Sequence, residues 1–182
     1  ITSRGLGDVY KRQLFYDSPE ELGEFEEVEA DQLPPNYRQL LAHHSHMTVT
    51  LEEFHRSMVD VRVLDSITSN SHYSRTIVLH RKSDSRAVQY GIVRLHRSFL
   101  EDEVFEEIVE QREPLGRILI RHNVLRQVKL LSLWNVELGP ALKSALDRSE
   151  LEICYGRTAL IYCNGLPAVE LLEIVVADDD EA

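Results

Sequence analysis

Apolar and polar residues follow a β-rich pattern over most of the chain after residue 58. Val59, Val61 and Val63 alternate with polar or charged neighbours, as in a strand that buries one face. Asn164-Gly165 lies between the last two apolar runs and is a strong signal for a tight hairpin. Apolar runs bounded by polar turns predict further strands over 73–79, 87–95, 124–136, 153–163 and 167–176.

Helical spacing is found in several segments before and between these strands. Apolar residues between 98 and 111 recur every three or four positions with acids between them, which predicts an amphipathic helix. The segment 116–122 fits a short helix or a strand. Shorter helices are expected over 36–44, over 51–57 after a Thr50–Glu53 capping box, and over 139–146.

Because turns join most consecutive strands, we expect an α+β fold. It should be a single domain with a mainly antiparallel sheet of about six strands, flanked by helices.

Charge divides the chain into a nearly neutral body and two acidic ends. Residues 1–31 carry nine acids and three bases, the body 32–177 carries eighteen acids and seventeen bases, and the tail 178–182 adds four acids. Acidic segments with few apolar residues are usually solvated. We therefore expect an acidic disordered linker over 14–33, a folded domain over 34–177 and an acidic tail over 178–182.

The first thirteen residues look foreign to a folded domain. The run Asp8-Val9-Tyr10-Lys11-Arg12-Gln13 matches the translation of a transposon-type sequencing adapter. We therefore interpret residues 1–13 as an adapter-derived artefact and leave them out of the fold reasoning.

The composition argues against membrane, nucleic-acid and nucleotide-binding classes. No run of 18 or more apolar residues occurs that could form a transmembrane helix, and the nearly neutral body lacks the basic footprint that nucleic-acid binding needs. Neither a Gly-rich phosphate loop nor a dinucleotide fingerprint is present. The two cysteines, Cys154 and Cys163, are too few for a disulfide framework. We therefore expect a cytoplasmic protein, a monomer or weak homo-oligomer, whose partner is a small molecule.

One cluster suggests a metal site, namely His43, His44 and His46. No cysteine or carboxylate follows it at ligand spacing, and a structural or catalytic zinc site needs a fuller set of ligands. A polar helix end explains the cluster better, so we expect no metal.

Arginines are the strongest candidates for ligand contacts. Arg117 follows Gly116, and Arg157 follows Gly156. A glycine lets the backbone approach a ligand closely, while a guanidinium binds a carboxylate through two parallel hydrogen bonds. Arg75 begins an otherwise apolar strand, where it is either a surface residue or a buried ligand group.

Glu170 and Glu173 interrupt the last apolar strand. A carboxylate in such a strand faces solvent or is buried with a partner. Because the two residues are three positions apart, a regular strand places them on opposite faces. At most one of them can then enter an internal site.

A series of short segments carries a family resemblance over about residues 36–176. The segments are Ser45-His46-Met47-Thr48, His72-Tyr73-Ser74-Arg75, Pro114-Leu115-Gly116-Arg117, Tyr155-Gly156-Arg157, and Gly165-Leu166-Pro167 leading into Glu170 and Glu173. Together they resemble the chorismate pyruvate-lyase family, the 4-hydroxybenzoate synthases, and in particular its actinobacterial-type branch. The resemblance implies a chorismate lyase-like fold, in which helical flaps cover an internal ligand site on an antiparallel sheet.

The resemblance also implies roles for individual residues. Arg75 matches the arginine that pairs with the ligand carboxylate, and Met47 and Leu115 match residues that contact the ligand. The catalytic glutamate of the family matches Glu173 if one residue is inserted in the last strand, which implies a β-bulge near 170–172. Further candidates for substrate binding are Arg117, Arg157 and Glu170, of which Glu170 is the second choice for the pocket glutamate.

The implied activity is that of a carbon–oxygen lyase that cleaves chorismate to 4-hydroxybenzoate and pyruvate. Aromatisation of the ring drives the reaction, so the resemblance implies neither a cofactor nor a metal. The alternative is a non-catalytic protein of the same fold that binds a hydroxybenzoate-like or effector molecule.

Overall fold

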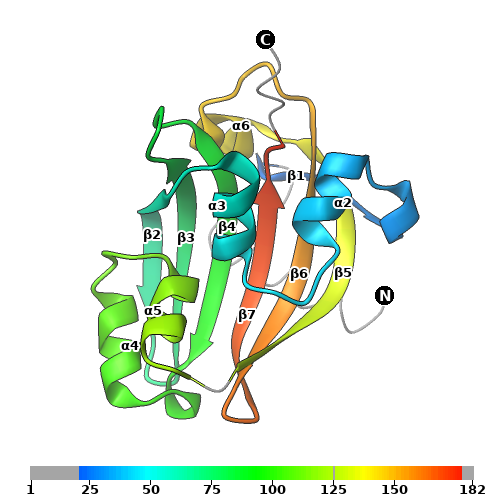
Figure 1. Ribbon diagram of the computed structural model, residues 1–182. Coiled ribbons are helices and arrows are strands. Elements are labelled where there is room, and N and C mark those ends of the chain that lie inside the picture. Colours follow the sequence, from blue (N-terminus) through cyan, green and yellow to red (C-terminus); the bar gives the residue numbers. More distant parts are fainter. Residues whose placement is uncertain (1–20, 125, 178–182) are drawn as a thin grey trace.

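The computed structural model describes residues 21–124 and 126–177. In this part of the chain one antiparallel sheet forms, with strand order β1-β5-β6-β7-β4-β3-β2, and helices cover it (Figure 1). The expected single-domain α+β fold is therefore confirmed, with one strand more than expected. The strands are β1 (Gly23–Val28), β2 (Val59–Thr68), β3 (His72–Arg81), β4 (Ala87–His96), β5 (Arg126–Leu138), β6 (Ile153–Cys163) and β7 (Leu166–Val175).

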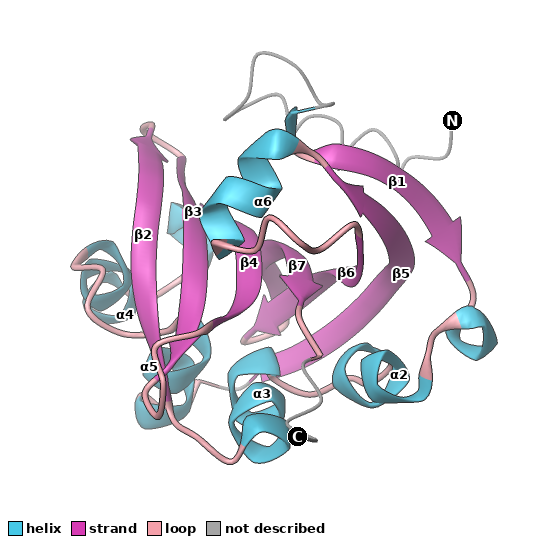
Figure 2. Cartoon of the chain, turned by 90° about the horizontal axis from the view of Figure 1, so that it is seen from above, coloured by secondary structure: helices cyan, strands magenta, loops and turns pink. Residues whose placement is uncertain are grey.

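Helices cover both faces of the sheet. Viewed from above, α6 lies on one side of the curved sheet, whereas α2, α3 and α5 lie on the other (Figure 2). The helices are α2 (Pro35–Leu41), α3 (Met47–His55), α4 (Asp102–Val109), α5 (Leu115–Arg121) and α6 (Pro140–Leu146), with two 3-10 turns, η2 (Ala30–Gln32) and η3 (Arg97–Phe99).

Strand β1 corrects the prediction of a disordered linker, which is wrong from residue 21 onward. β1 pairs antiparallel with β5 over its whole length. Leu22 is fully buried, and Phe25 packs edge-on against Trp134 with 6.3 Å between the ring centroids. Gly23 has a φ of 145°, and a Cβ at this position would collide with the Glu137 carbonyl oxygen. The glutamates of β1 face solvent at the edge of the sheet, so the charge pattern concealed the strand.

Two helix predictions also change. The helix expected over 51–57 begins at Met47, and its N-cap is His46 rather than Thr50. Thr50 instead donates a hydrogen bond from its hydroxyl to the His46 carbonyl oxygen, 3.2 Å away, so no Thr50–Glu53 capping box forms. The undecided segment 116–122 is helical as α5, which starts after its N-cap residue Pro114.

The core forms on both faces of the sheet. On one face α6 buries Leu142 and Leu146 against Tyr90, Ile174 and their neighbours. On the other face α4 and α5 pack over one half of the sheet and α2 and α3 over the other. This second face carries the candidate site, because its helices meet above β3, β4, β7 and β6.

No helix in the described ranges is long and apolar enough to cross a membrane. The predictions for residues 1–13, for 14–20 of the linker and for the 178–182 tail lie outside the described residues.

Candidate functional site

A small cavity lies between the sheet and the helices α3 and α5. Its volume is about 40 Å³, which is room for about three water molecules at roughly 10–15 Å³ each. Apolar side chains of the strands form much of its wall. The polar groups of the wall are concentrated on four neighbouring strands: Arg75 on β3, Gln89 on β4, Glu173 on β7 and Arg157 on β6.

Strand pairing explains why these four side chains share a face. Gly91 on β4 lies directly opposite Glu173 on β7, and Glu173 lies directly opposite Arg157 on β6. Directly paired residues of antiparallel strands point to the same side of the sheet, as do residues two apart on one strand. Gln89 is two residues from Gly91, and Arg75 is two residues from Ile77, the β3 partner of Gly91.

Arg75 is fully buried, with none of its surface exposed to solvent. Its Nη1 donates a hydrogen bond to the Ile108 carbonyl oxygen near the end of α4, 3.2 Å away. Within the described part of the chain, Nε and Nη2 meet no hydrogen-bond acceptor. Burial lowers the pKa of the Arg75 guanidinium, and Tyr73 partly offsets this effect, yet an arginine stays protonated in proteins. A buried positive charge with two free donor atoms therefore faces the cavity.

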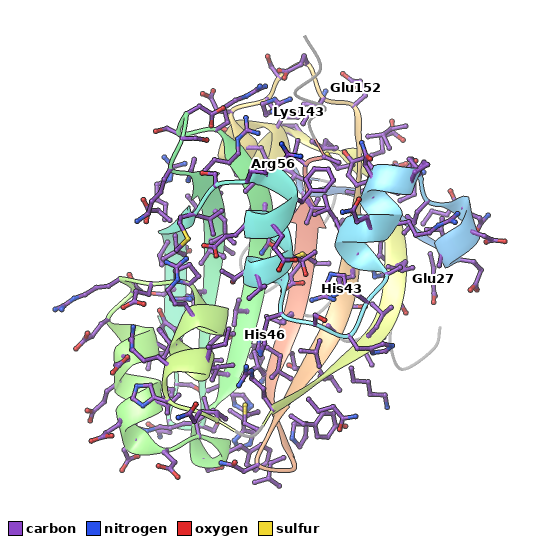
Figure 3. The ribbon with its side chains drawn as sticks, in the orientation of Figure 1. Glu27, His43, His46, Arg56, Lys143 and Glu152 are labelled. Atoms are coloured by element: carbon purple, nitrogen blue, oxygen red, sulfur yellow. The ribbon has the colours of Figure 1, made fainter. Side chains whose placement is uncertain are left out.

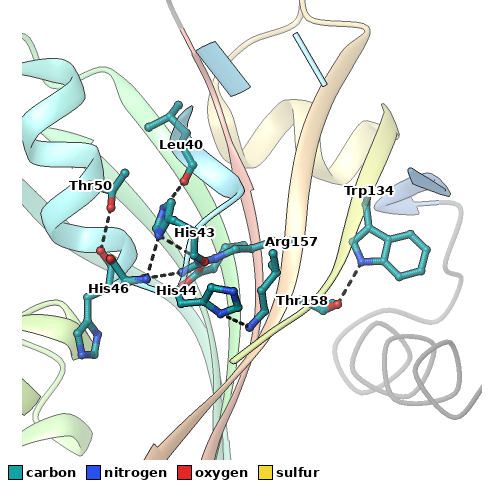
Figure 4. Close-up of polar contacts among 11 residues, drawn as sticks. Leu40, His43, His44, His46, Thr50, Trp134, Arg157 and Thr158 are labelled. Atoms are coloured by element: carbon teal, nitrogen blue, oxygen red, sulfur yellow. Dashed lines mark hydrogen bonds and ion pairs between the residues drawn. The ribbon is translucent and has the colours of Figure 1, made fainter. Parts of the chain in front are cut away.

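Arg157 is buried to the same degree but its donors are used. Nε donates to Glu173 Oε2 at 2.7 Å, Nη1 donates to the His43 carbonyl oxygen at 3.0 Å, and Nη2 donates to the Ser45 carbonyl oxygen at 3.1 Å. Figure 4 shows Arg157 reaching the segment between α2 and α3 in this way. Arg157 thus fixes Glu173 and ties this segment to the sheet, and little of its hydrogen-bonding capacity is left for a ligand.

Glu173, and not Glu170, lies in the cavity wall. Glu173 is 5% exposed, whereas the Glu170 side chain is 37% exposed and pairs with Arg94 Nη1 at 3.7 Å. Pairing of β7 is regular from Val169 to Val175, so alternation alone separates the two glutamates. The bulge predicted near 170–172 is absent there; the nearest register shift lies between Ile161 and Tyr162 on β6.

The first turns of α3 and α5 close the cavity. Met47 and Leu115 both line it and are 4% and 7% exposed. The two helices approach closely at Gly116, where a Cβ would lie 3.0 Å from Thr48 Oγ1. The first turn of α3 also brings the positive end of its dipole toward the cavity.

Arg117 does not line the cavity, although the sequence singled it out. It forms an ion pair with Glu52 of α3, and Glu52 Oε1 also accepts a hydrogen bond from the Val59 backbone N–H at 3.1 Å. Arg117 therefore joins α5 to α3 above the site. Its contribution is to the cover of the cavity rather than to its wall.

His46 lies at the edge of the cavity, on the connection that crosses in front of the sheet in Figure 3. It lines both the cavity and a surface groove of about 780 Å³. Burial, with smaller effects of Arg126 and Arg157, lowers the pKa of His46 to about 4. The imidazole is therefore neutral at pH 7, and its Nε2 has no hydrogen-bond partner among the described residues.

The structure thus brings together Arg75, Glu173, Met47, Leu115 and Arg157, and it leaves Arg117 and Glu170 outside the cavity wall. The sequence analysis missed Gln89, a buried polar residue in an apolar strand. The available signal was the same one that singled out Glu173, namely a polar side chain in an apolar strand. Across the described ranges, no group of three or more His, Cys, Asp or Glu side chains is arranged to hold a metal ion.

No family model matches the chain, and no curated protein matches it in sequence. Among solved structures, it is similar to the possible transcriptional regulator YydK from Bacillus subtilis subsp. subtilis str. 168, with 11% identity and a TM-score of 0.47, over 66% of this chain and 59% of that one. It is also similar to the effector binding domain of the B. subtilis trehalose repressor TreR, with 10% identity and a TM-score of 0.39, over 68% of this chain and 96% of that one. At these identities both likenesses concern the fold alone.

Proposed function

We propose that this chain binds a small organic acid in the cavity, with the ligand carboxylate on Arg75. The observation that carries the proposal is the fully buried guanidinium whose Nε and Nη2 meet no acceptor in the described structure. A buried charge without a partner is strongly unfavourable. A carboxylate supplies both the missing charge and two acceptor oxygens in the geometry that a guanidinium fits.

The charges of the cavity wall other than Arg75 favour a ligand with one carboxylate at the Arg75 end of the cavity. The other buried guanidinium, Arg157, is already paired with Glu173, so the net charge of the buried groups Arg75, Arg157 and Glu173 is about +1. One carboxylate on Arg75 brings this to neutrality. A second carboxylate on the ligand would have to lie toward the cover formed by α3 and α5.

Binding requires the cavity to grow. A volume of about 40 Å³ is far below the ~150 Å³ at which a cavity holds a benzene ring. The mobile part of the wall is expected to be the first turns of α3 and α5, because the opposite wall is the middle of the sheet. The ion pair between Arg117 of α5 and Glu52 of α3 joins these helices, so it has to break when they separate.

The binding proposal is tested by titrating purified protein with 4-hydroxybenzoate and following heat or tyrosine fluorescence. Saturable binding that is lost in Arg75→Ala and only partly restored in Arg75→Lys supports the proposal, because a point charge cannot replace the fork. The loss expected for Arg75→Ala is about 2–5 kcal/mol, the cost of leaving a buried charge unpaired. Equal affinity in the wild type and Arg75→Ala would disprove it.

We further propose that the bound acid is chorismate and that the chain is a chorismate pyruvate-lyase. The observation that favours catalysis over binding alone is Glu173, a buried carboxylate in the same wall as Arg75. Glu173 pairs with Arg157, and a carboxylate at this position of the wall can also accept a proton from a bound ligand. A reaction that moves a proton needs such a group within reach.

In this reaction the C–O bond between the ring and the enolpyruvyl group breaks. The electrons of that bond leave with the enolpyruvyl oxygen, and the departing fragment gains a proton at its methylene carbon to become pyruvate. The ring carbon that carries the hydroxyl loses its hydrogen, and the ring becomes aromatic. Arg75 would hold the ring carboxylate, and Glu173 would accept or relay the ring proton. The first turns of α3 and α5 would exclude water.

Incubating the protein with chorismate distinguishes the two proposals. Equimolar 4-hydroxybenzoate and pyruvate, formed at the same rate after dialysis against a chelator, would support the lyase. Saturable binding of 4-hydroxybenzoate without turnover of chorismate would support the binding proposal and contradict the lyase proposal. Turnover that is lost after dialysis and restored by a divalent ion would contradict the metal-independent mechanism.

A further inference from the structure

Gln89 is a polar residue of the cavity wall for which the described residues provide no complete set of hydrogen-bond partners. It lies on β4, is 4% exposed and lines the cavity. Its Oε1 accepts no hydrogen bond from any residue that the structure describes. A buried acceptor without a donor is unfavourable, and Gln89 is surrounded in the wall by aliphatic side chains such as Ile77 and Leu79.

The sheet register places Gln89 at the far end of the cavity wall from Arg75. Arg75 lies opposite Val93, and Gln89 lies opposite Leu79, so the two positions are four residues apart along the strands. At about 3.3 Å per residue this is a separation of roughly 13 Å between backbones. Glu173 is opposite Gly91, which lies between the two ends.

Gly91 also sets the direction of the Gln89 side chain. A Cβ on Gly91 would lie 3.3 Å from Gln89 Nε2 and 3.2 Å from Ile77 Cγ1. The amide of Gln89 therefore lies over Gly91 and leans along the strand toward Arg75. The Gln89 amide therefore lies closer to the Arg75 end of the cavity than the Gln89 backbone does.

We propose that Gln89 determines ligand specificity by accepting a hydrogen bond from a hydroxyl group that the ligand carries on the ring carbon opposite its carboxylate. The inference rests on the proposed carboxylate contact of Arg75. Arg75 provides donors at one end of the site, and Gln89 provides an acceptor at the other. A ring acid with a hydroxyl at this position satisfies both groups, whereas the same acid without the hydroxyl leaves Oε1 buried and unpaired.

The test compares 4-hydroxybenzoate with benzoate, which differ only by this hydroxyl, in titrations of the wild type, Gln89→Leu and Gln39→Leu. Gln39 lies on the exposed face of α2 and provides the same chemical change away from the site. We expect the wild type and Gln39→Leu to bind 4-hydroxybenzoate about 10- to 100-fold more tightly than benzoate. In Gln89→Leu this preference should disappear, because the affinity for 4-hydroxybenzoate falls while that for benzoate changes by about twofold or less.

The other outcomes separate this inference from the proposed function. If the wild type and Gln89→Leu prefer 4-hydroxybenzoate over benzoate to the same degree, the role of Gln89 is overturned while Arg75-dependent binding stands. The same holds if Gln89→Leu loses affinity for both acids equally. If the wild type binds neither acid, or if Arg75→Met binds as tightly as the wild type, both the role of Gln89 and the proposed function are overturned. The melting temperature of ligand-free Gln89→Leu should not fall, because the substitution removes a buried unpaired acceptor. If Gln89→Leu does not fold, the titrations are made with Gln89→Met, which keeps the length of the side chain.

Discussion

Replacing Arg75 with methionine is expected to stabilise the ligand-free protein, although the residue is buried. Most substitutions of a fully buried side chain destabilise a fold. Arg75 should be an exception because its Nε and Nη2 have no acceptor among the described residues. Methionine fills a similar volume without charge and adapts to irregular space.

The magnitude follows from the contacts of the guanidinium. The substitution removes the hydrogen bond from Nη1 to the Ile108 carbonyl oxygen, which costs about 1.5–3 kcal/mol for a charged donor, and the favourable interaction of the guanidinium with Tyr73. It also removes two unpaired donor atoms of a buried ion, and replacing buried ionic groups by apolar ones often stabilises by about 1–4 kcal/mol after all terms are included. We expect a net gain of about 1–2 kcal/mol, or about 2–8 °C in melting temperature for a domain of this size.

Arg157 provides a matched control. It is also fully buried, but it pairs with Glu173 and binds two carbonyl oxygens. Arg157→Met leaves the Glu173 carboxylate buried without its partner, and breaking such a pair costs about 3–5 kcal/mol. Its melting temperature should therefore fall by about 6 °C or more.

The assay is thermal unfolding of the three proteins with and without 4-hydroxybenzoate. Ligand at a hundredfold excess over its Kd should stabilise the wild type by about 2.7 kcal/mol, and Arg75→Met should show no such shift. A melting temperature of Arg75→Met several degrees below that of the wild type, with the ligand shift retained, would refute the reasoning. Arg75 would then be a structural residue that anchors α4.

Three further predictions concern the wall and cover of the cavity. Glu173→Gln should lower kcat for chorismate cleavage about 10²- to 10⁴-fold while Glu170→Gln leaves kcat unchanged; equal effects in steady-state kinetics would contradict the assignment. Unfolding measured between pH 7 and 4 should show stability falling as the pH drops below 6.5, because burial depresses the pKa of His46 to about 4 and the unfolded chain takes up the proton first. The upper bound of this loss is about 3 kcal/mol, which solvent at this partly exposed site reduces to ~1–2 kcal/mol, and a His46→Gln variant with the same pH dependence would argue against the assignment. Gly116→Val should lower the melting temperature by about 2–8 °C, since a Cβ there already lies 3.0 Å from Thr48 Oγ1; an unchanged melting temperature would show that the helices separate without cost.

The hydrophobic periodicity of the sequence predicted those strands and helices that bury one whole face or both faces. The strands β4, β6 and β7 were recognisable because apolar side chains dominate their buried positions, and β3 was recognisable from its apolar run Ile77–Leu79. β1 was not, because at the sheet edge only Leu22, Phe25 and Val28 pack inward while its glutamates stay in solvent. The start of α3 was misplaced because the connection before it is fixed by Arg157, a contact between residues more than 100 positions apart that no local pattern records.

Strand alternation and residue chemistry predicted only part of the candidate site. Alternation correctly implied that Glu170 and Glu173 face opposite sides, but it could not say which side is the cavity. Residue chemistry alone did not rank Arg75, Arg117 and Arg157, and only the family resemblance singled out Arg75. Tertiary pairing separates them, since Arg157 donates to Glu173 and Arg117 binds Glu52. Arg75 has two donor atoms, Nε and Nη2, without an acceptor among the residues that the structure describes.

The closed cover of the cavity has a consequence for the speed of binding. Because the cavity of about 40 Å³ is too small for the ligand while Met47 and Leu115 lie over it, each association event waits for α3 and α5 to separate. The observed association rate should then level off at high ligand concentration, at the rate of this opening, instead of rising in proportion to concentration. Release is governed by the same opening, so a bound acid is retained for longer than its affinity alone would suggest. A product formed inside the cavity would leave at this pace, and the movement of two short helices rather than bond cleavage would then set the number of turnovers per second.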